Sequence, residues 1–259
     1  MEITASLVKE LRERTGIWML ECKKALIAAN GDIEAAIEEL RKKWLAKAAL
    51  KADREALEWA IKIIVEWSKA YIVSVSCETD FLANSDRYKD MLNDVIALLK
   101  AGKTREDAKA MIDKNYSLEM WENLQIKDFV TVEGTSVWAY VHSNNKIASV
   151  VVAKVSIPEE KLKQVAMHIT AANPEFLNAS DISSEVIEKE KAIQLEIMKN
   201  DPKMAGKPDE VLFKIIEGKM SKFASEVSLL EQAFVINPEQ KVKDFIWADT
   251  ISTFYRFSI

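Results

Sequence analysis

The architecture of this chain depends on one stretch, Ile72-Val73-Ser74-Val75-Ser76-Cys77-Glu78-Thr79-Asp80-Phe81-Leu82. Its first half is rich in β-branched residues and predicts a strand that ends near Cys77. The tetrapeptide 79–82 then places an aromatic side chain beside a carboxylate at the end of that strand. Because phenylalanine is usually buried, the common interpretation is a helix cap followed by a core residue. The alternative is an exposed apolar side chain that fits a pocket on a partner protein.

The composition is that of an ordinary globular protein. The chain has 259 residues, of which 49% are hydrophobic and 30% charged, enough for two domains or for one domain with appendages. Its formal net charge of −5 argues against general or direct nucleic-acid binding, which usually requires a basic balance. No apolar run approaches the ~20 residues that span a bilayer, so we expect no membrane partner.

The start of the chain and its cysteines predict a cytoplasmic protein. Residues 1–6 lack the basic and apolar regions of a secretory signal. Cys22 and Cys77 are too few for a disulfide framework, and we expect reduced, mostly buried packing residues rather than nucleophiles. The two histidines and the absence of a Cys/His cluster argue against a zinc site. The sequence also lacks a GxxxxGK[ST] phosphate loop, and no cofactor is expected.

Three short helices are predicted at the N-terminus. The first covers residues 4–14, with Thr4 as its N-cap. The second runs from about Met19 to Ala29 and ends at Asn30-Gly31. The third follows Asp32, and residues 44–58 form a helical or extended linker. The inward-facing residues expected from helical spacing are Leu7, Val8, Leu11, Leu20, Ala25, Leu26, Ala29, Ile33, Ala36, Ile37 and Leu40.

The remainder predicts an α+β core with antiparallel strands. Strands are expected at 60–66, 71–77, 129–133, 136–142, 147–155 and 251–257. Helices are expected at 84–100, 103–115, 158–172, 183–199, 209–225 and 241–248. Residues 66–70 connect the first two strands, and residues 143–146 form a tight hairpin. A turn between 199 and 209, marked by proline and glycine, makes the two long helices an antiparallel hairpin.

Several blocks of the sequence resemble bacterial elongation factor Ts, and they occur in the order of that family across nearly the whole chain. They are Ile3–Gly16, Cys22–Leu26, Asn30–Glu34, Cys77–Phe81, Met167–Ile169, Pro174–Phe176 and Glu226–Val235. The resemblance implies an N-terminal ubiquitin-associated-like three-helix domain at 1–52. It further implies a core of two subdomains, at 53–156 and 157–259, with a projecting helical hairpin inserted at about 184–227. The C-terminal module of longer family members is expected to be absent.

The resemblance implies a guanine-nucleotide exchange factor without covalent chemistry, hence not an enzyme. Its partner would be elongation factor Tu, both GDP-bound and nucleotide-free, and it would promote GDP release during translation elongation. The binding and magnesium-displacing residues would be Thr79, Asp80, Phe81 and Leu82. Phe81 would insert between two helices of the nucleotide domain of the partner. Asp80 would lie near the magnesium ion and the phosphate loop.

The resemblance also implies further contacts with the partner. Arg12, Met19 and Leu20 match a contact surface of the N-terminal domain, although helical spacing also allows Met19 and Leu20 to be core residues. Ile147 and His168 match positions of the second subdomain that face the partner. A single histidine on an apolar helix face is equally well a structural residue. The hairpin at 184–227 could form a homodimer, contact the partner, or be a solvated structural arm.

Glycine is scarce and tryptophan abundant, with six and seven residues. The tryptophans are Trp18, Trp44, Trp59, Trp67, Trp121, Trp138 and Trp247, and the family typically has glycine at or beside most of these positions. Trp67 is the clearest case, because a turn between two strands needs a residue that can adopt a positive φ. We hypothesise that many are glycines encoded by UGA in an organism that reads this codon as glycine. The alternative is genuine replacement, accommodated by repacking.

Two other functions stay open on the residues alone. One is a helical adaptor whose α+β portion binds a different client and has no effect on nucleotide kinetics. The other is an enzyme, whose best candidate groups would be Asp80 and His168. Nothing in the sequence brings these two side chains together.

Overall fold

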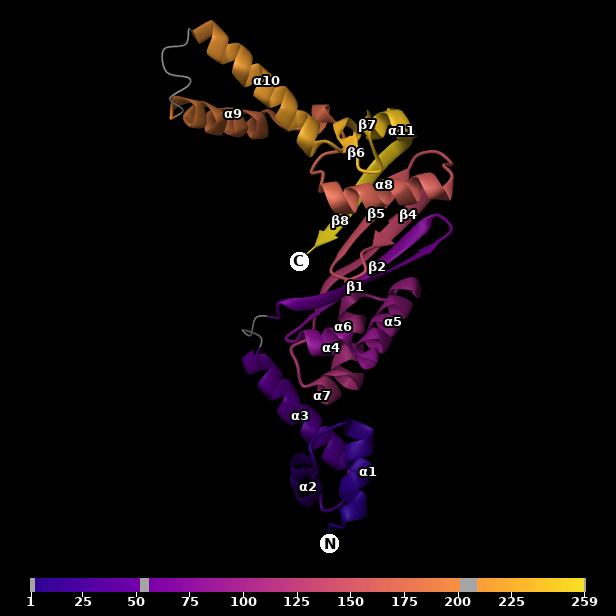
Figure 1. Cartoon of the computed structure of the whole chain (residues 1–259). Helices are drawn as coiled ribbons and strands as arrows, with labels where there is room; N and C mark the ends of the chain where they lie inside the picture. Colours follow the sequence, from indigo (N-terminus) through magenta and orange to yellow (C-terminus); the bar gives the residue numbers. More distant parts are fainter. Residues whose placement is uncertain (1–2, 52–55, 201–208, 259) are drawn as a thin grey trace. The chain divides into compact units, whose positions relative to one another are not determined.

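The computed structural model describes residues 3–51, 56–200 and 209–258. Helices and antiparallel strands share the chain, which is therefore of the α+β class, as predicted (Figure 1). The chain divides into two compact units. The first contains the residues up to Val132 together with 143–146, and the second contains Glu133–His142 and Ile147–Ser258.

The first unit begins with the three predicted helices. They are α1 (Ala5–Thr15), α2 (Met19–Ala28) and α3 (Ile33–Lys51). Thr4 caps α1 as expected, since its hydroxyl accepts a hydrogen bond from the N–H of Leu7 at 3.3 Å. Leu11 and Leu26 are fully buried in the core between these helices. The prediction that Leu20 faces inward is wrong: its side chain is 64% exposed, because the buried stripe of α2 runs through Cys22, Ala25 and Leu26.

The predicted linker agrees with the structure where the linker is described, whereas the predicted first turn differs. Helix α3 continues as far as Lys51, so the linker at 44–58 is helical in its first part, while residues 52–55 lie outside the described residues. Strands β1 (Glu58–Glu66) and β2 (Lys69–Cys77) pair antiparallel from Glu58↔Cys77 to Glu66↔Lys69. The connection is therefore a two-residue turn, Trp67-Ser68, instead of the predicted five residues. Two-residue turns are the commonest way to join such strands.

A third strand and four helices complete the first unit. They are β3 (Gln125–Glu133), which joins the sheet in the order β1-β2-β3, and α4 (Asp80–Asn84), α5 (Asp86–Lys100), α6 (Arg105–Asn115) and α7 (Ser117–Met120). Helix α5 packs on the sheet through Tyr88, Met91 and Val95, all fully buried. The hydroxyl of Tyr88 donates a hydrogen bond to the carbonyl of Val75. This contact ties α5 to the strand that leads into residues 79–82.

The second unit is a three-stranded antiparallel sheet covered by a helix. Its strands are β4 (Ser136–Val141), β5 (Ile147–Ala153) and β8 (Ile251–Ser258), in the order β4-β5-β8. Helix α8 (Glu159–Ala172) follows Pro158, as predicted, and buries Leu162, Val165 and Ile169 against the sheet. The smaller elements are η1 (Ala179–Asp181), η2 (Leu229–Glu231), β6 (Ala233–Phe234), β7 (Asn237–Lys241), α11 (Val242–Ile246) and η3 (Ala248–Thr250). The β6–β7 pair was not predicted.

The two long helices of the second unit are α9 (Ser184–Lys199) and α10 (Asp209–Val227) (Figure 1). The side chains of Lys219 and Gln194 join them, with the amine donating to the amide oxygen at 2.8 Å. Their bounds agree with the predicted helices within a few residues. The predicted turn between them, at 201–208, lies outside the described residues.

Candidate functional site

The tetrapeptide 79–82 lies where strand β2 turns into helix α4. Thr79 has extended backbone angles, φ −125° and ψ 147°, and its hydroxyl accepts a hydrogen bond from the N–H of Leu82 at 3.3 Å. This is the geometry of a helix N-cap, which the pattern of Thr followed by Asp favours. At the other end of α4, the side-chain amide of Asn84 donates to the carbonyl of Asp80 at 2.8 Å. Hydrogen bonds therefore hold the short helix at both ends.

Helix α4 has one buried side and one exposed side. Ala83 is buried and Leu82 packs partly against the core of the first unit. Phe81 lies on the opposite side and is 86% exposed, and Asp80 beside it is also exposed. Burial of a phenylalanine side chain is worth about 1.5–3 kcal/mol, and the folded chain alone does not gain it here. The interpretation of Phe81 as a core residue is therefore wrong, and the structure favours a docking side chain.

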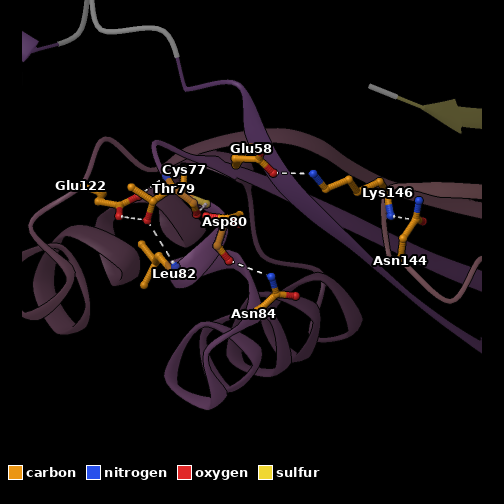
Figure 2. A network of polar contacts seen from close by, with 9 residues as sticks. All are labelled: Glu58, Cys77, Thr79, Asp80, Leu82, Asn84, Glu122, Asn144 and Lys146. Carbon is orange, nitrogen blue, oxygen red and sulfur yellow. Dashed lines mark hydrogen bonds and ion pairs between the residues drawn. The ribbon is translucent and has the colours of Figure 1, made fainter.

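A carboxylate from a distant part of the chain holds the turn before α4 (Figure 2). Glu122 follows α7, and one of its oxygens accepts hydrogen bonds from the N–H groups of Glu78 at 2.7 Å and Thr79 at 3.0 Å. Its other oxygen accepts one from the hydroxyl of Thr79. In return, the carboxylate of Glu78 accepts one from the N–H of Asn123 at 2.9 Å. The two segments therefore fix each other.

The neighbouring cysteine is a packing residue, as expected. Cys77 is buried, and its thiol donates to the carbonyl of Thr79 at 3.3 Å. Burial raises the pKa of Cys77 to about 12, and the carboxylate of Glu122 adds to the shift. Burial also raises the pKa of Cys22. A raised pKa disfavours the thiolate that nucleophilic chemistry requires.

The loop between β4 and β5 contacts the start of β1 (Figure 2). The ammonium of Lys146 pairs with the carboxylate of Glu58 at 2.5 Å, and the N–H of Lys146 donates to the side chain of Asn144 at 2.9 Å. Asn145 has a φ of 56° and accepts a hydrogen bond from the N–H of Ile61 at 2.9 Å. Asparagine tolerates this left-handed conformation, as the predicted hairpin required.

The three candidate residues of the N-terminal helices are all exposed. Arg12 lies on α1, and Met19 and Leu20 open α2, where their side chains are 47% and 64% exposed. Neither Met19 nor Leu20 is therefore a core residue, which settles the alternative that helical spacing left open. Trp18 and Ile27 are also exposed apolar residues of this domain, and sequence reasoning had not named either as a contact residue.

The two candidate residues of the second unit differ in exposure. Ile147 begins β5 and is half-buried, whereas His168 on α8 is fully buried. The Nδ1 atom of His168 accepts the N–H of Val235 at 3.2 Å, so the ring proton lies on Nε2. That nitrogen donates to the side-chain oxygen of Gln232 at 2.9 Å. Burial lowers the pKa of His168, while the bond to Gln232 opposes the shift, and the ring is neutral. His168 is thus a structural residue in this conformation.

The chain is similar to known proteins over nearly its whole length. The elongation factors Ts of Haemophilus ducreyi and Marinobacter nauticus are 44% and 45% identical to this chain, over 265 and 257 residues. These matches cover 100% and 94% of this chain, and 91% and 86% of the relatives. That of Spiroplasma citri is 42% identical over 266 residues, or 97% of this chain and 90% of the relative. Residues 78–259 match the family described as Elongation factor TS. The chain belongs to the elongation factor Ts family.

Elongation factor Ts is the nucleotide exchange factor of elongation factor Tu in translation elongation, and it performs no covalent chemistry. The family and the function implied by the sequence blocks are thereby confirmed. Within residues 3–51, 56–200 and 209–258, no group of three or more His, Cys, Asp or Glu side chains could hold a metal ion. None of the helices in the described part of the chain is long and apolar enough to cross a membrane.

Sequence reasoning found the exposed residues of this elongation factor Ts but missed the residue that supports them. Glu122 is separated from Thr79 by 43 positions, so no local spacing connects the two. It also missed Gln232, whose amide donates to the carbonyl of Glu226 at 2.7 Å while accepting from His168. Gln232 lies in the block Glu226–Val235 that resembles the family, whereas no signal in the sequence pointed to Glu122.

Proposed function

We propose that Thr79, Asp80, Phe81 and Leu82 carry the exchange activity, by binding elongation factor Tu·GDP and weakening its hold on magnesium and nucleotide. The single observation that supports this proposal is the exposure of Phe81 on a helix that is otherwise anchored to the core. Phe81 inserts between two helices of the nucleotide domain of the partner, as the resemblance implies. Leu82 and Thr79 hold the short helix from which it projects.

The energetics of exchange require a preference for the nucleotide-free partner. A ligand shifts an equilibrium only by its differential affinity for the two states. Burial of Phe81 in the partner contributes about 1.5–3 kcal/mol, and this energy is available only where the pocket for the ring is open. If opening that pocket displaces the elements that position magnesium, nucleotide-free elongation factor Tu binds more tightly than the GDP complex. GDP release is then accelerated.

Asp80 supplies the electrostatic part of the proposal. Its carboxylate is exposed beside Phe81 and enters the region of the magnesium ion and the phosphate loop with it. A negative charge there competes with the phosphate oxygens for the cation. It also raises the energy of the GDP-bound state, which carries negative charge of its own.

Further contacts come from both units of the chain. Arg12, Met19 and Leu20 form an exposed surface on the N-terminal helices that binds the nucleotide domain of the partner. In the second unit, Ile147 is half-buried at the start of β5. His168 is buried, so it acts through the backbone of Val235, which is exposed together with Ile236.

The finer organisation also belongs to this proposal. The chain comprises a ubiquitin-associated-like domain at 1–52 and two core subdomains, the second of which includes β4 and β5, and it acts in the cytoplasm, where elongation takes place. The hairpin of α9 and α10 projects from the second subdomain. Several apolar side chains of the hairpin are exposed, namely Ile193, Leu195, Ile197, Val211 and Phe213. They suit either a homodimer or a further contact with elongation factor Tu.

The proposal is tested by the release of fluorescent GDP from elongation factor Tu, measured in stopped flow with the wild-type chain, Phe81→Ala and Asp80→Asn. We expect acceleration by the wild type and a loss of about tenfold or more with Phe81→Ala, since tenfold corresponds to ~1.4 kcal/mol. The matched control is Val130→Ala, an exposed apolar residue of β3 in the same unit. Equal rates for Phe81→Ala and the wild type would contradict the proposal. If no variant accelerated release, the adaptor alternative would apply.

A further inference from the structure

We infer that Glu122 is a positioning residue for nucleotide exchange, because its carboxylate fixes the turn from which Phe81 projects. The inference rests on the proposed role of Phe81. Glu122 touches neither nucleotide nor magnesium in this scheme. It acts through Thr79, on the first residues of α4, and its effect on exchange requires the Phe81 side chain.

Three hydrogen bonds converge on this one side chain. The N–H groups of Glu78 and Thr79 share one oxygen at 2.7 and 3.0 Å. The hydroxyl of Thr79 donates to the other oxygen (Figure 2). Hydrogen bonds to a charged acceptor are about twice as strong as neutral ones. A bidentate contact also fixes direction, because both oxygens must stay in place at once. The backbone on both sides of the 78–79 peptide is therefore held against rotation.

The hydroxyl of Thr79 transmits this constraint to the helix. It has one proton, which it donates to Glu122, so its lone pairs face the N–H of Leu82. The carboxylate thus orients the group that caps α4. Without Glu122, the hydroxyl of Thr79 could rotate and donate its proton elsewhere. The N–H of Leu82 would then lose a fixed acceptor, and the first turn of α4 would be less ordered. Phe81 lies in this first turn, so the direction of its ring depends on the cap.

The segment that contains Glu122 is itself held by a hydrogen bond to a carboxylate. The carboxylate of Glu78 accepts the N–H of Asn123 at 2.9 Å, so each of the two glutamates binds the backbone beside the other. Leu124, directly beyond, is buried in the core of the first unit. This anchor prevents Glu122 from following a movement of the Thr79 turn. The pair forms a rigid support for an element that would otherwise consist of a single helical turn.

A double-mutant cycle separates positioning from general stability. Release of fluorescent GDP is measured over a range of concentrations of the wild type, Glu122→Ala, Phe81→Ala and the double variant, giving a maximal rate and a half-saturating concentration. We expect Glu122→Ala to lower the maximal rate about tenfold in the Phe81 background and to have little effect in the Phe81→Ala background. Residues that act as a unit show this non-additivity. Glu122→Gln, which keeps one acceptor oxygen, should recover part of the rate.

The matched control is Glu66→Ala, which removes a carboxylate of the same unit that pairs with Lys100 on the surface. Equal losses from Glu122→Ala in both backgrounds, or no loss beyond that of Glu66→Ala, would overturn the inference. If Glu122→Ala does not fold, Thr79→Val and Glu122→Gln replace it in the cycle. A Phe81→Ala variant with wild-type exchange would instead refute the proposed function, so the two failures are distinguishable.

A different observation carries a second inference. We propose that glycine stands at positions 67, 121 and 247 in the protein as its own cells make it. Among the described residues, six other than glycine have a positive φ: Asn30, Asn145, Asn173, Trp67, Trp121 and Trp247. Asparagine is expected there, since its short polar side chain tolerates this conformation. Tryptophan is bulky, and for such residues a positive φ is an outlier.

The surroundings of these tryptophans support the same conclusion. Trp67 fills the first position of the β1–β2 turn with a φ of 56°, and its side chain is 99% exposed, so it contributes nothing to the core. Trp121 ends α7 in the left-handed conformation, where glycine is the preferred residue. Its side chain packs partly against the core of the N-terminal helices, so for this position the backbone alone supports glycine. Trp247 has φ 61° and ψ 124° and is also exposed. In each case the positive φ favours glycine, because the Cβ of a bulky L-residue is strained there.

A reassigned codon explains all three positions at once. If the source cell reads as glycine a codon that has been translated as tryptophan, each tryptophan from that codon becomes glycine. Scarce glycine and abundant tryptophan follow from the same cause. The test is peptide mass spectrometry on the protein isolated from its source cells. Peptides covering positions 67, 121 and 247 should have the mass of glycine, and tryptophan masses at these positions would overturn the proposal.

Discussion

The Nδ1 atom of His168 accepts the backbone N–H of Val235 at 3.2 Å, and this is possible only while the ring is neutral. The proton on Nε2 is at the same time used by Gln232. Protonation of Nδ1 would replace the acceptor by a second donor that faces an N–H group. A buried histidine with this environment makes the stability of the second unit depend on pH.

We expect the free energy of unfolding to fall as the pH is lowered through 6.5. Burial lowers the pKa of His168 below this ordinary value, so the unfolded chain takes up the proton while the folded chain does not. The unfolded state binds more protons there, and stability rises with pH, by at most ~1.4 kcal/mol per unit. Urea unfolding over this range should show that His168→Gln reduces the slope. The exposed His142→Gln should retain it.

Phe81→Ala should leave the folded chain nearly as stable as the wild type, within about 0.5 kcal/mol, because the ring has little contact in the free protein. Leu82→Ala, one residue further on, should destabilise it by about 1–2 kcal/mol, since Leu82 packs against the core. Denaturant unfolding of the two variants measures these changes in the free energy of unfolding. A comparable loss of stability in both variants would mean that Phe81 is buried in solution.

Trp67→Gly should stabilise the recombinant chain by about 1 kcal/mol, because glycine adopts the left-handed conformation of the turn without a steric penalty. Trp67→Ala removes the same ring but retains Cβ, and it should remain near the wild type. The midpoint temperatures of thermal unfolding of the wild type, Trp67→Gly and Trp67→Ala test this prediction. If alanine and glycine raised the midpoint equally, the benefit would come from losing the exposed ring and not from the backbone.

Both thiols should react slowly with thiol reagents in the folded protein near neutral pH. Cys22 and Cys77 are fully buried, and burial raises the pKa of Cys77 to about 12. Reaction with a chromogenic disulfide reagent should therefore be slow, and it should become rapid for two thiols per chain when denaturant is added. Fast labelling of one thiol without denaturant would indicate local opening near that residue.

Tyr88→Phe should destabilise the chain by about 1–2 kcal/mol, because the carbonyl of Val75 loses a hydrogen-bond donor inside the core. Burial raises the pKa of the Tyr88 hydroxyl, so it stays a donor over the accessible pH range. Denaturant unfolding measures this change in the free energy of unfolding. Tyr71→Phe is the matched control, because Tyr71 lies on β2, the strand of Val75, and is only partly buried; it should have a smaller effect.

Local signals predicted most of the elements of this chain. Thr4 and Pro158 mark helix starts, and Asn30-Gly31 marks a helix end, because capping depends on residues only a few positions apart. The exposure of Phe81 could be proposed only through the family blocks, since its spacing alone is equally typical of a core residue. The site was therefore predicted by resemblance, and the exposure of Phe81 in the structure supports that prediction.

Features that depend on distant residues could not be predicted. Glu122 and Thr79 are brought together by the whole of α5, α6 and α7, and no pattern within either segment indicates the contact. Leu20 was assigned to the core because apolar spacing allows more than one buried stripe on a short helix. The β6–β7 pair escaped prediction because β6 contains two residues, too few for an alternating pattern.

The turn that carries Phe81 is held by groups other than the ring itself: the carboxylate of Glu122, the cap of Thr79 and the packing of Leu82. Selection for folding and selection for exchange therefore act on different residues of the same helical turn. Position 81 can change in size or polarity without unfolding the helical turn, so the exchange rate can evolve as the partner changes. The neighbouring residues, which hold the turn, cannot change as freely.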